Sequence, residues 1–201
     1  MENQHKVIIF VAPSGAGKTT LAKEVIKKFP KHIALSISAT TRLKRPNETE
    51  AIDYYFISDG DFKQRISSHQ FIEWAEVYDG TFYGTLKSEV DRIFNENKMV
   101  CFDVDVAGAK ALKNYFKDQA CVIFVTVPGE EKKQKLDELR KRLESRNTET
   151  VSKIEDRLEK AKSELEFEKT DYVDYVLVNE ELSQAIRLAE KIVFDFAHVS
   201  A

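Results

Sequence analysis

The 201-residue sequence has no long hydrophobic run and no excess of positive charge. No apolar stretch approaches the roughly 20 residues that a membrane-spanning helix needs. The apolar run at residues 7–11 is also too short for the hydrophobic region of a signal peptide. A net charge of -3 argues against a general nucleic-acid or anionic-membrane surface, which normally carries a basic excess. We therefore expect a cytoplasmic protein without membrane or nucleic-acid partners.

Cysteine and histidine are too sparse and too scattered for a metal site or a disulfide framework. Cys101 and Cys121 lie in apolar runs that predict strands, and they show no C-x-x-C spacing. The four histidines show no H-E-x-x-H or similar ligand spacing. We expect both cysteines to be core residues, and we expect no zinc site.

Short apolar runs that predict buried strands alternate with segments that have helical periodicity. The runs are residues 6–11, 99–102, 121–127 and 175–178. Apolar residues at helical spacing follow the first, second and fourth runs, and Pro30 ends the first of these helices. This order predicts an α/β fold, with a parallel sheet covered by helices on both faces.

Two segments interrupt this alternation. Residues 36–85 are rich in Ser, Thr, Tyr and Phe and predict a small inserted β-rich domain. Residues 129–169 are densely charged, but their leucines keep helical spacing and predict two amphipathic helices joined near Asn147. A solvated helical hairpin is the alternative for the second segment. The predicted core then comprises residues 1–35, 86–128 and 170–201.

A phosphate-loop motif lies between the first strand and the first helix. Residues 12–19 match G-x-x-x-x-G-K-[ST] except at the first position, where Ala12 replaces glycine. Gly15 and Gly17 allow backbone N–H groups to surround a phosphate. Lys18 is expected to reach the β- and γ-phosphates of ATP, and the Thr19 hydroxyl to bind Mg²⁺. The predicted ATP-binding residues are Ala12, Pro13, Ser14, Gly15, Ala16, Gly17, Lys18, Thr19 and Thr20. A strand-to-helix turn that binds nothing is the alternative.

Arginine and tyrosine side chains in residues 36–85 suit a phosphate ester. Arg42 and Arg45 lie three positions apart beside Ser and Thr residues, and Tyr54 and Tyr83 follow in aromatic runs. Guanidinium groups and phenol hydroxyls together supply charge and directed hydrogen bonds to phosphate oxygens. These residues predict a second phosphate site, for the acceptor of a phosphoryl group.

The motifs and their order resemble the guanylate kinase family over nearly the whole chain, from Val7 to the closing helix. This resemblance implies Mg·ATP as donor, GMP as acceptor, a GMP-binding domain at residues 36–85 and a lid at residues 129–169. By the same resemblance the GMP phosphate would contact Arg42, Arg45, Tyr54 and Tyr83, and the guanine would face Ser38, Glu73 and Thr85. A carboxylate agrees with this, because guanine presents N1–H and N2–H₂ donors on one edge. The other aromatic residues, Phe56, Phe71 and Trp74, are expected in the core.

Acidic residues end the strand predicted at residues 99–102. Asp103 and Asp105 lie where open α/β sheets bind ligands, and the segment resembles the I-L-D-I-D sequence of the family. Asp103 is the preferred candidate, either orienting Mg²⁺ through water or contacting the guanine amino group. A capping aspartate is the alternative.

Arginines in the charged segment resemble those of the family lid, which close over ATP. Arg142 and Arg146 are four residues apart and share a helical face, and Arg157 approaches from the second helix. Together with Lys18 they are the predicted catalytic residues, because their charges would stabilise the transferring phosphoryl group. An ordinary helical surface is the alternative for each arginine.

Two other functions are alternatives to a GMP kinase. One is a guanylate-kinase-like module that binds phosphopeptides without catalysis, against which the intact phosphate loop argues. The other is a kinase for a ribosyl phosphate, against which Ser38 and Glu73 argue, because a sugar phosphate has no base edge for a carboxylate to recognise. The sequence leaves the oligomeric state open, with a homodimer among the options.

Overall fold

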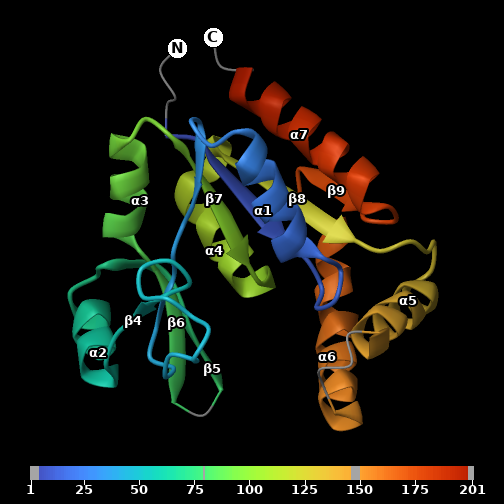
Figure 1. The fold of residues 1–201 in the computed structure, drawn as a ribbon, viewed down its shortest axis with the longest axis horizontal. Helices are drawn as coiled ribbons and strands as arrows, with labels where there is room; N and C mark the ends of the chain where they lie inside the picture. The colour runs from blue at the N-terminus through green and yellow to red at the C-terminus, as the bar shows by residue number, and fades with distance from the viewer. Residues whose placement is uncertain (1–4, 79, 146–149, 199–201) are drawn as a thin grey trace.

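The computed structural model describes residues 5–78, 80–145 and 150–198, which form a five-stranded sheet, a separate four-stranded sheet and a helical hairpin (Figure 1). All neighbours in the larger sheet are parallel, in the order β2-β7-β1-β8-β9. These strands are β1 (Val7–Val11), β2 (Ile33–Leu35), β7 (Met99–Val104), β8 (Ala120–Thr126) and β9 (Tyr175–Val178). Every residue of β1 and β8 is buried, as expected for strands that are covered on both faces.

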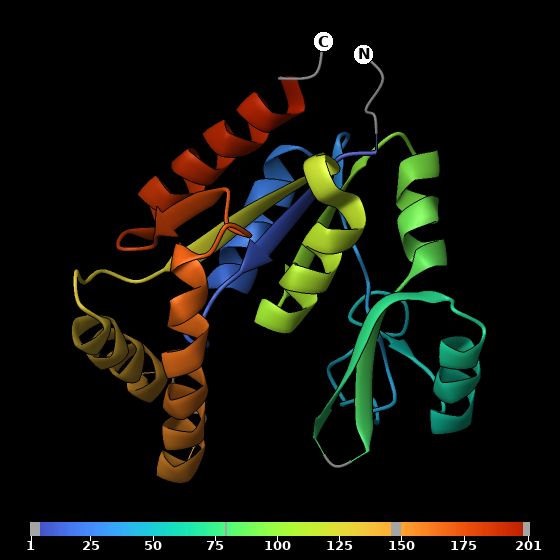
Figure 2. The same cartoon turned by 180° about the vertical axis from the view of Figure 1, so that it is seen from behind.

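Helices cover both faces of the larger sheet (Figures 1 and 2). Helices α1 (Lys18–Lys28) and α7 (Leu182–His198) pack on one face, and α3 (Lys87–Asn95) and α4 (Val106–Phe116) pack on the other. Strand β1 contributes Ile8 and Phe10 to the first apolar cluster and Val7, Ile9 and Val11 to the second. The predicted α/β fold is therefore confirmed.

Both cysteines are buried in strands of this sheet, as predicted. A short 3-10 helix, η1 (Lys117–Gln119), connects α4 to β8. Among the helices that the structure describes, none is both long and apolar enough to cross a membrane.

The smaller sheet lies within the segment for which the sequence predicts a β-rich insertion. Its order is β4-β3-β6-β5, with strands β3 (Ala39–Thr40), β4 (Tyr55–Phe56), β5 (Phe71–Tyr78) and β6 (Thr81–Leu86). Helix α2 (Asp59–Ser67) packs on it and was not predicted from the sequence. Ser58 caps this helix by accepting a hydrogen bond from the Asp61 N–H, and the buried Phe62 stacks on Phe71.

One predicted core residue is wrong in this sheet. Trp74 is 46% exposed, whereas Phe71 is buried and Phe56 is half-buried. Because β5 is an edge strand with β6 as its only partner in the sheet, Trp74 has little to cover it, and its ring contacts Phe82 at a centroid distance of 6.1 Å.

The charged segment forms two helices, as its leucine spacing predicts. They are α5 (Lys132–Ser145) and α6 (Val151–Glu164), followed by the 3-10 helix η2 (Leu165–Lys169). The predicted join at Asn147 lies outside the described residues. Leu139 and Leu143 of α5 share an apolar cluster with Ala16 of the phosphate loop, so the hairpin packs against that loop.

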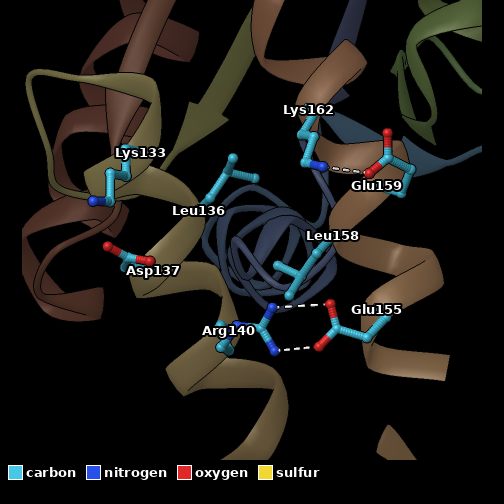
Figure 3. Close-up of a pocket in the computed structure, with 8 residues that line it drawn as sticks. All are labelled: Lys133, Leu136, Asp137, Arg140, Glu155, Leu158, Glu159 and Lys162. Atoms are coloured by element: carbon cyan, nitrogen blue, oxygen red, sulfur yellow. Dashed lines mark hydrogen bonds and ion pairs between the residues drawn. The ribbon is translucent and has the colours of Figure 1, made fainter. Parts of the chain in front are cut away.

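A groove of about 210 Å³ lies between α5 and α6 (Figure 3). Arg140 and Glu155 form a two-pronged ion pair in it, with Nη2 to Oε2 at 2.9 Å. The lining residues are Lys133, Leu136, Asp137, Arg140, Glu155, Leu158, Glu159 and Lys162. None of them is a predicted site residue, so this groove belongs to the internal packing of the hairpin.

Candidate phosphoryl-transfer site

The phosphate loop lies at the carboxyl end of β1, between β7 and β8, where open parallel sheets bind ligands. Gly15 and Gly17 have φ values of +96° and +91°, in the left-handed region that glycine tolerates best. A Cβ atom at Gly17 would lie 2.5 Å from the side-chain nitrogen of Asn179. Ala12, which departs from the motif, is buried and is not among the described residues with positive φ. Glycine therefore occupies both positions of this loop at which the backbone has a positive φ.

Strand pairing brings Asp103 to the phosphate-loop lysine. The register of β1 with β7 places Phe10 opposite Asp103 and Val11 opposite Val104. The Lys18 ammonium forms an ion pair with the Asp103 carboxylate and donates a hydrogen bond to the Val104 carbonyl at 2.7 Å. A cation and an acid thus meet where the loop would hold a phosphate.

The second acid of this strand end has a different role. Asp105 caps α4 by accepting a hydrogen bond from the Gly108 N–H at 3.1 Å, and it also accepts one from Lys160 of α6. Burial raises the pKa of Asp105, but the Gly108 N–H and the Lys160 ammonium outweigh it, and the net pKa is lowered. The capping alternative therefore describes Asp105, whereas Asp103 pairs with Lys18.

Two of the three predicted arginines reach the phosphate loop and its neighbours. Arg157 donates from Nη1 to the Ser14 hydroxyl at 2.9 Å. Arg142 donates from Nη2 to the backbone carbonyl of Asn179 at 2.8 Å, and the Asn179 side chain donates to the Ala16 carbonyl at 2.8 Å. Arg146 lies outside the described residues.

The residues predicted to hold the acceptor phosphate come together on the smaller sheet, with one exception. Arg42 donates from Nε to the Tyr83 hydroxyl at 3.2 Å, and its guanidinium carbon lies 5.4 Å from the centroid of the Tyr54 ring. Arg45 is exposed, and its described hydrogen bonds are made by its backbone, whose N–H donates to the Glu48 carboxylate at 2.9 Å and whose carbonyl accepts from the Glu48 N–H at 3.1 Å.

Glu48 holds the Arg42 guanidinium in place, a role that sequence reasoning did not assign. Its oxygens accept from Nη1 and Nη2 of Arg42 at 3.0 and 2.7 Å. The bond from Arg42 lowers the pKa of Glu48 to about 2, and the Arg45 N–H adds to this effect. Glu48 follows Arg42 and Arg45 in the same loop, so an acidic residue close to two arginines was the feature of the sequence that could have indicated this role.

The residues predicted to face a base also lie on the smaller sheet. Glu73 of β5 is paired with Thr85 of β6, whose hydroxyl donates to Glu73 Oε1 at 2.6 Å. Burial raises the pKa of Glu73, the Thr85 bonds oppose this, and the negative charge of Asp105 adds to it. Ser38 precedes β3 and is half-buried. The Glu73 carboxylate is thus held by Thr85 and lies close enough to the start of α4 for the charge of Asp105 to affect its pKa.

The comparison with known families decides the assignment. The guanylate kinase family model matches residues 4–195 of the chain. The chain belongs to the guanylate kinase family. It is 39% identical to the guanylate kinase of Porphyromonas gingivalis over 191 residues, and this alignment covers 95% of this chain and 97% of that protein. It is 43% identical over 181 residues to the guanylate kinase of Salinibacter ruber, covering 90% of each.

A solved structure agrees on the fold of this guanylate kinase family member. The crystal structure of guanylate kinase from Anaplasma phagocytophilum aligns with a TM-score of 0.70 and 23% identity, covering 98% of this chain and 89% of that one. The family and the enzyme class predicted from the sequence, a nucleoside monophosphate kinase, are confirmed, and none of these comparisons favours the inactive binding module.

Two further residues at the guanylate kinase phosphate loop were missed by sequence reasoning. Glu164, at the end of α6, is buried and accepts a hydrogen bond from the Ser14 N–H at 3.3 Å. Asn179, just after β9, joins the Ala16 carbonyl to Arg142. Neither belongs to a local motif, because each reaches the loop only through the tertiary arrangement.

Proposed function

We propose that the chain transfers the γ-phosphoryl group of Mg·ATP to GMP, giving ADP and GDP. The observation that carries this proposal is that two segments distant in the sequence, β7 and α6, both meet the phosphate loop. Lys18 of the phosphate loop pairs with Asp103 of β7, and Arg157 of α6 reaches Ser14 of the same loop. The smaller sheet supplies the second half of the site, with Arg42 and Tyr83 at one place and the half-buried Glu73 carboxylate at another.

Lys18, Arg142, Arg146 and Arg157 are proposed to stabilise the charge that develops on the transferring phosphoryl group. The backbone N–H groups of residues 12–20 hold the donor phosphates, helped by the positive N-terminal end of α1. Phosphoryl transfer needs mainly positioning and electrostatic stabilisation, so a set of fixed cations is the expected machinery. The role of Arg146 rests on its sequence position alone.

Thr19 and Asp103 fit Mg²⁺, which prefers hydroxyl and carboxylate oxygens and shares its coordination with phosphates and water. Thr19 is an exposed residue in the first turn of α1, and the Asp103 side chain is 20% exposed, so both are accessible to a hydrated ion. Among the residues that the structure describes, no three His, Cys, Asp or Glu side chains gather into a metal site. When bound, the ion neutralises phosphate charge.

The smaller sheet, within the proposed GMP-binding domain at residues 36–85, is proposed to select the acceptor. The phosphate of the acceptor would be held by Arg42, Arg45, Tyr54 and Tyr83, with Glu48 orienting Arg42. Its guanine would face Ser38, Glu73 and Thr85, with Asp103 as a further contact. The helices of residues 129–169 would act as the lid, and residues 1–35, 86–128 and 170–201 as the core.

The proposed setting of the reaction is the cytoplasm, with nucleotides as the only ligands. The acidic net charge supports the absence of a nucleic-acid partner. Light scattering of the purified chain would decide between a monomer and a homodimer.

A coupled ADP-release assay with GMP, dGMP, AMP, IMP and UMP as acceptors tests this function. We expect GMP to give the highest kcat/KM and AMP and UMP to give little turnover. Absence of turnover with every acceptor would favour the binding module, and equal use of all five would contradict base selection by Glu73.

A further inference from the structure

A buried carboxylate lies at the junction between the two sheets. The chain passes from β2 of the core sheet to β3 of the smaller sheet through residues 36–38, and it returns from β6 directly into α3. Glu89, the third residue of α3, is 2% exposed at this junction. A side chain here contacts both parts of the molecule and helps to set how the smaller sheet sits on the core.

Each oxygen of Glu89 accepts two hydrogen bonds. Oε1 accepts from the Ile37 N–H at 3.1 Å and from Arg92 Nη2 at 2.9 Å. Oε2 accepts from the Tyr55 hydroxyl at 2.8 Å and from Arg92 Nε at 2.9 Å. Arg92 lies on the same helix and supplies the balancing charge, whereas Ile37 and Tyr55 lie across the junction. Burial of an ionised carboxylate is costly unless it is paired and hydrogen-bonded, and both conditions are met here.

The bonds across the junction form a closed circuit. Glu89 holds Ile37 and the Tyr55 hydroxyl, and the backbone N–H of Tyr55 donates to the Ser38 carbonyl at 2.9 Å. The peptide that carries Ser38 is therefore held on both sides. Ser38 is one of the residues proposed to face guanine.

The same circuit reaches the proposed phosphate site through strand alternation. Tyr54 and Tyr55 are consecutive in extended backbone, so their side chains point to opposite faces. Tyr55 points to the junction and Glu89, while the Tyr54 ring lies 5.8 Å from the Tyr83 ring, beside Arg42. A shift of Tyr55 would move both Ser38 and Tyr54.

We propose that Glu89 is a positioning residue for GMP, which fixes the guanine-facing Ser38 and the phosphate-facing Tyr54 relative to the core through Ile37 and Tyr55. This inference rests on the proposed function, because it assumes that these residues bind GMP. Glu89 itself does not touch the substrate. Buried ion pairs are often replaceable by apolar residues without loss of stability, so a precise arrangement, more than stability, accounts for a charged group at this junction.

Steady-state kinetics of Tyr55→Phe and Glu89→Gln test the proposal, with Glu96→Gln as the matched control. Glu96 also pairs with Arg92 and ends α3, but it is exposed at the far end of the helix from the junction. Tyr55→Phe and Glu89→Gln should each raise the KM for GMP about 3- to 10-fold and leave the KM for ATP within about 2-fold. Glu96→Gln should change neither value. The double variant should raise the KM for GMP by less than the product of the single effects, because both changes act on the same contact between the side chains of residues 55 and 89.

A lowered melting temperature with unchanged KM values, or equal rises in both KM values, would mean that Glu89 only supports the fold and would overturn the proposal. If Glu89→Gln does not fold, Tyr55→Phe carries the test, because it removes one hydroxyl and leaves the carboxylate paired with Arg92. Ser38→Ala and Tyr54→Phe distinguish a failure of the proposed GMP site from a failure of the positioning role of Glu89. If both are silent toward GMP, the proposed GMP site is wrong; if they act and Tyr55→Phe does not, the positioning role alone fails.

Discussion

Replacing Glu73 by glutamine tests how the enzyme chooses its base. The carboxylate is half-buried, and the Thr85 hydroxyl donates a hydrogen bond to Oε1 at 2.6 Å, which holds the carboxylate on the smaller sheet. Guanine offers N1–H and N2–H₂ as donors, whereas adenine offers the bare lone pair of N1 to the same carboxylate. Glu73→Gln keeps the shape of the side chain but replaces one acceptor by a donor.

The expected loss follows from the value of a charge-assisted hydrogen bond. Such a bond contributes about 1.5 to 3 kcal/mol, which corresponds to roughly 10- to 150-fold in kcat/KM for GMP. IMP lacks the N2 amino group, so the ratio of kcat/KM for GMP to that for IMP should narrow. The KM for ATP should stay unchanged, because Glu73 lies on the smaller sheet, away from the phosphate loop.

Glu76→Gln is the matched control for this experiment, because Glu76 is an exposed carboxylate on the same strand that bonds the Gly80 N–H at the hairpin turn. It should leave the acceptor ratio unchanged. If Glu73→Gln uses GMP as well as the wild type does, with the same GMP to IMP ratio, Glu73 does not read the base.

Stability should change in the opposite direction from activity. Burial raises the pKa of Glu73, so ionising this carboxyl costs folded-state stability. The cost is complete above the raised pKa and absent below the unfolded value of about 4.3. Glu73→Gln should therefore raise Tm at about pH 8, and the gain should shrink as the pH falls toward about 4. An equal gain at both pH values would contradict this electrostatic account.

Three further substitutions test other parts of the molecule. Lys18→Ala should lower kcat by roughly 10² or more with little change in Tm, because its charge serves the phosphates, while Lys23→Ala on the exposed side of α1 should be silent in the same assay. Gly17→Ala should raise the KM for ATP sharply, because the new Cβ atom would lie 2.5 Å from the Asn179 side chain and because the backbone φ of +91° is strained for alanine. The double variant Gly17→Ala/Asn179→Ala should recover only part of the affinity for ATP, since it relieves the contact but not the strained φ. Phe62→Ala should lower the free energy of unfolding by about 3 to 5 kcal/mol in denaturant titrations, and GMP binding should be lost before ATP binding. Equal loss of both ligands would show that the smaller sheet is not a separable unit.

Features encoded locally were predictable from the sequence. The continuous apolar run at residues 175–178 matches β9 residue for residue, and the run at 121–127 differs from β8 by one residue at each end. The phosphate loop was also readable, because a buried strand, a glycine turn and a helix follow one another without interruption. Helix α2 was missed because it is short and Phe62 is its only buried residue, so its apolar periodicity is weak.

The partners of the site residues depended on tertiary structure. Arg42 was predicted to bind phosphate, but its hydrogen bonds to Glu48 depend on a loop conformation that no sequence periodicity indicates. Asn179 reaches Ala16 from 163 positions along the chain, and Glu164 reaches Ser14 from 150.

The sequence by itself determined four of the five strands of the larger sheet, β1, β7, β8 and β9, and the phosphate loop, because these depend on neighbours within a few positions. Only the tertiary structure decided that Asp103, not Asp105, pairs with Lys18, that Trp74 is exposed and that Glu89 joins the two sheets. Each of these outcomes depends on strand order and on the register between distant segments. Strand order and register are set by how the apolar faces of all segments pack together, so they cannot be inferred from any one segment.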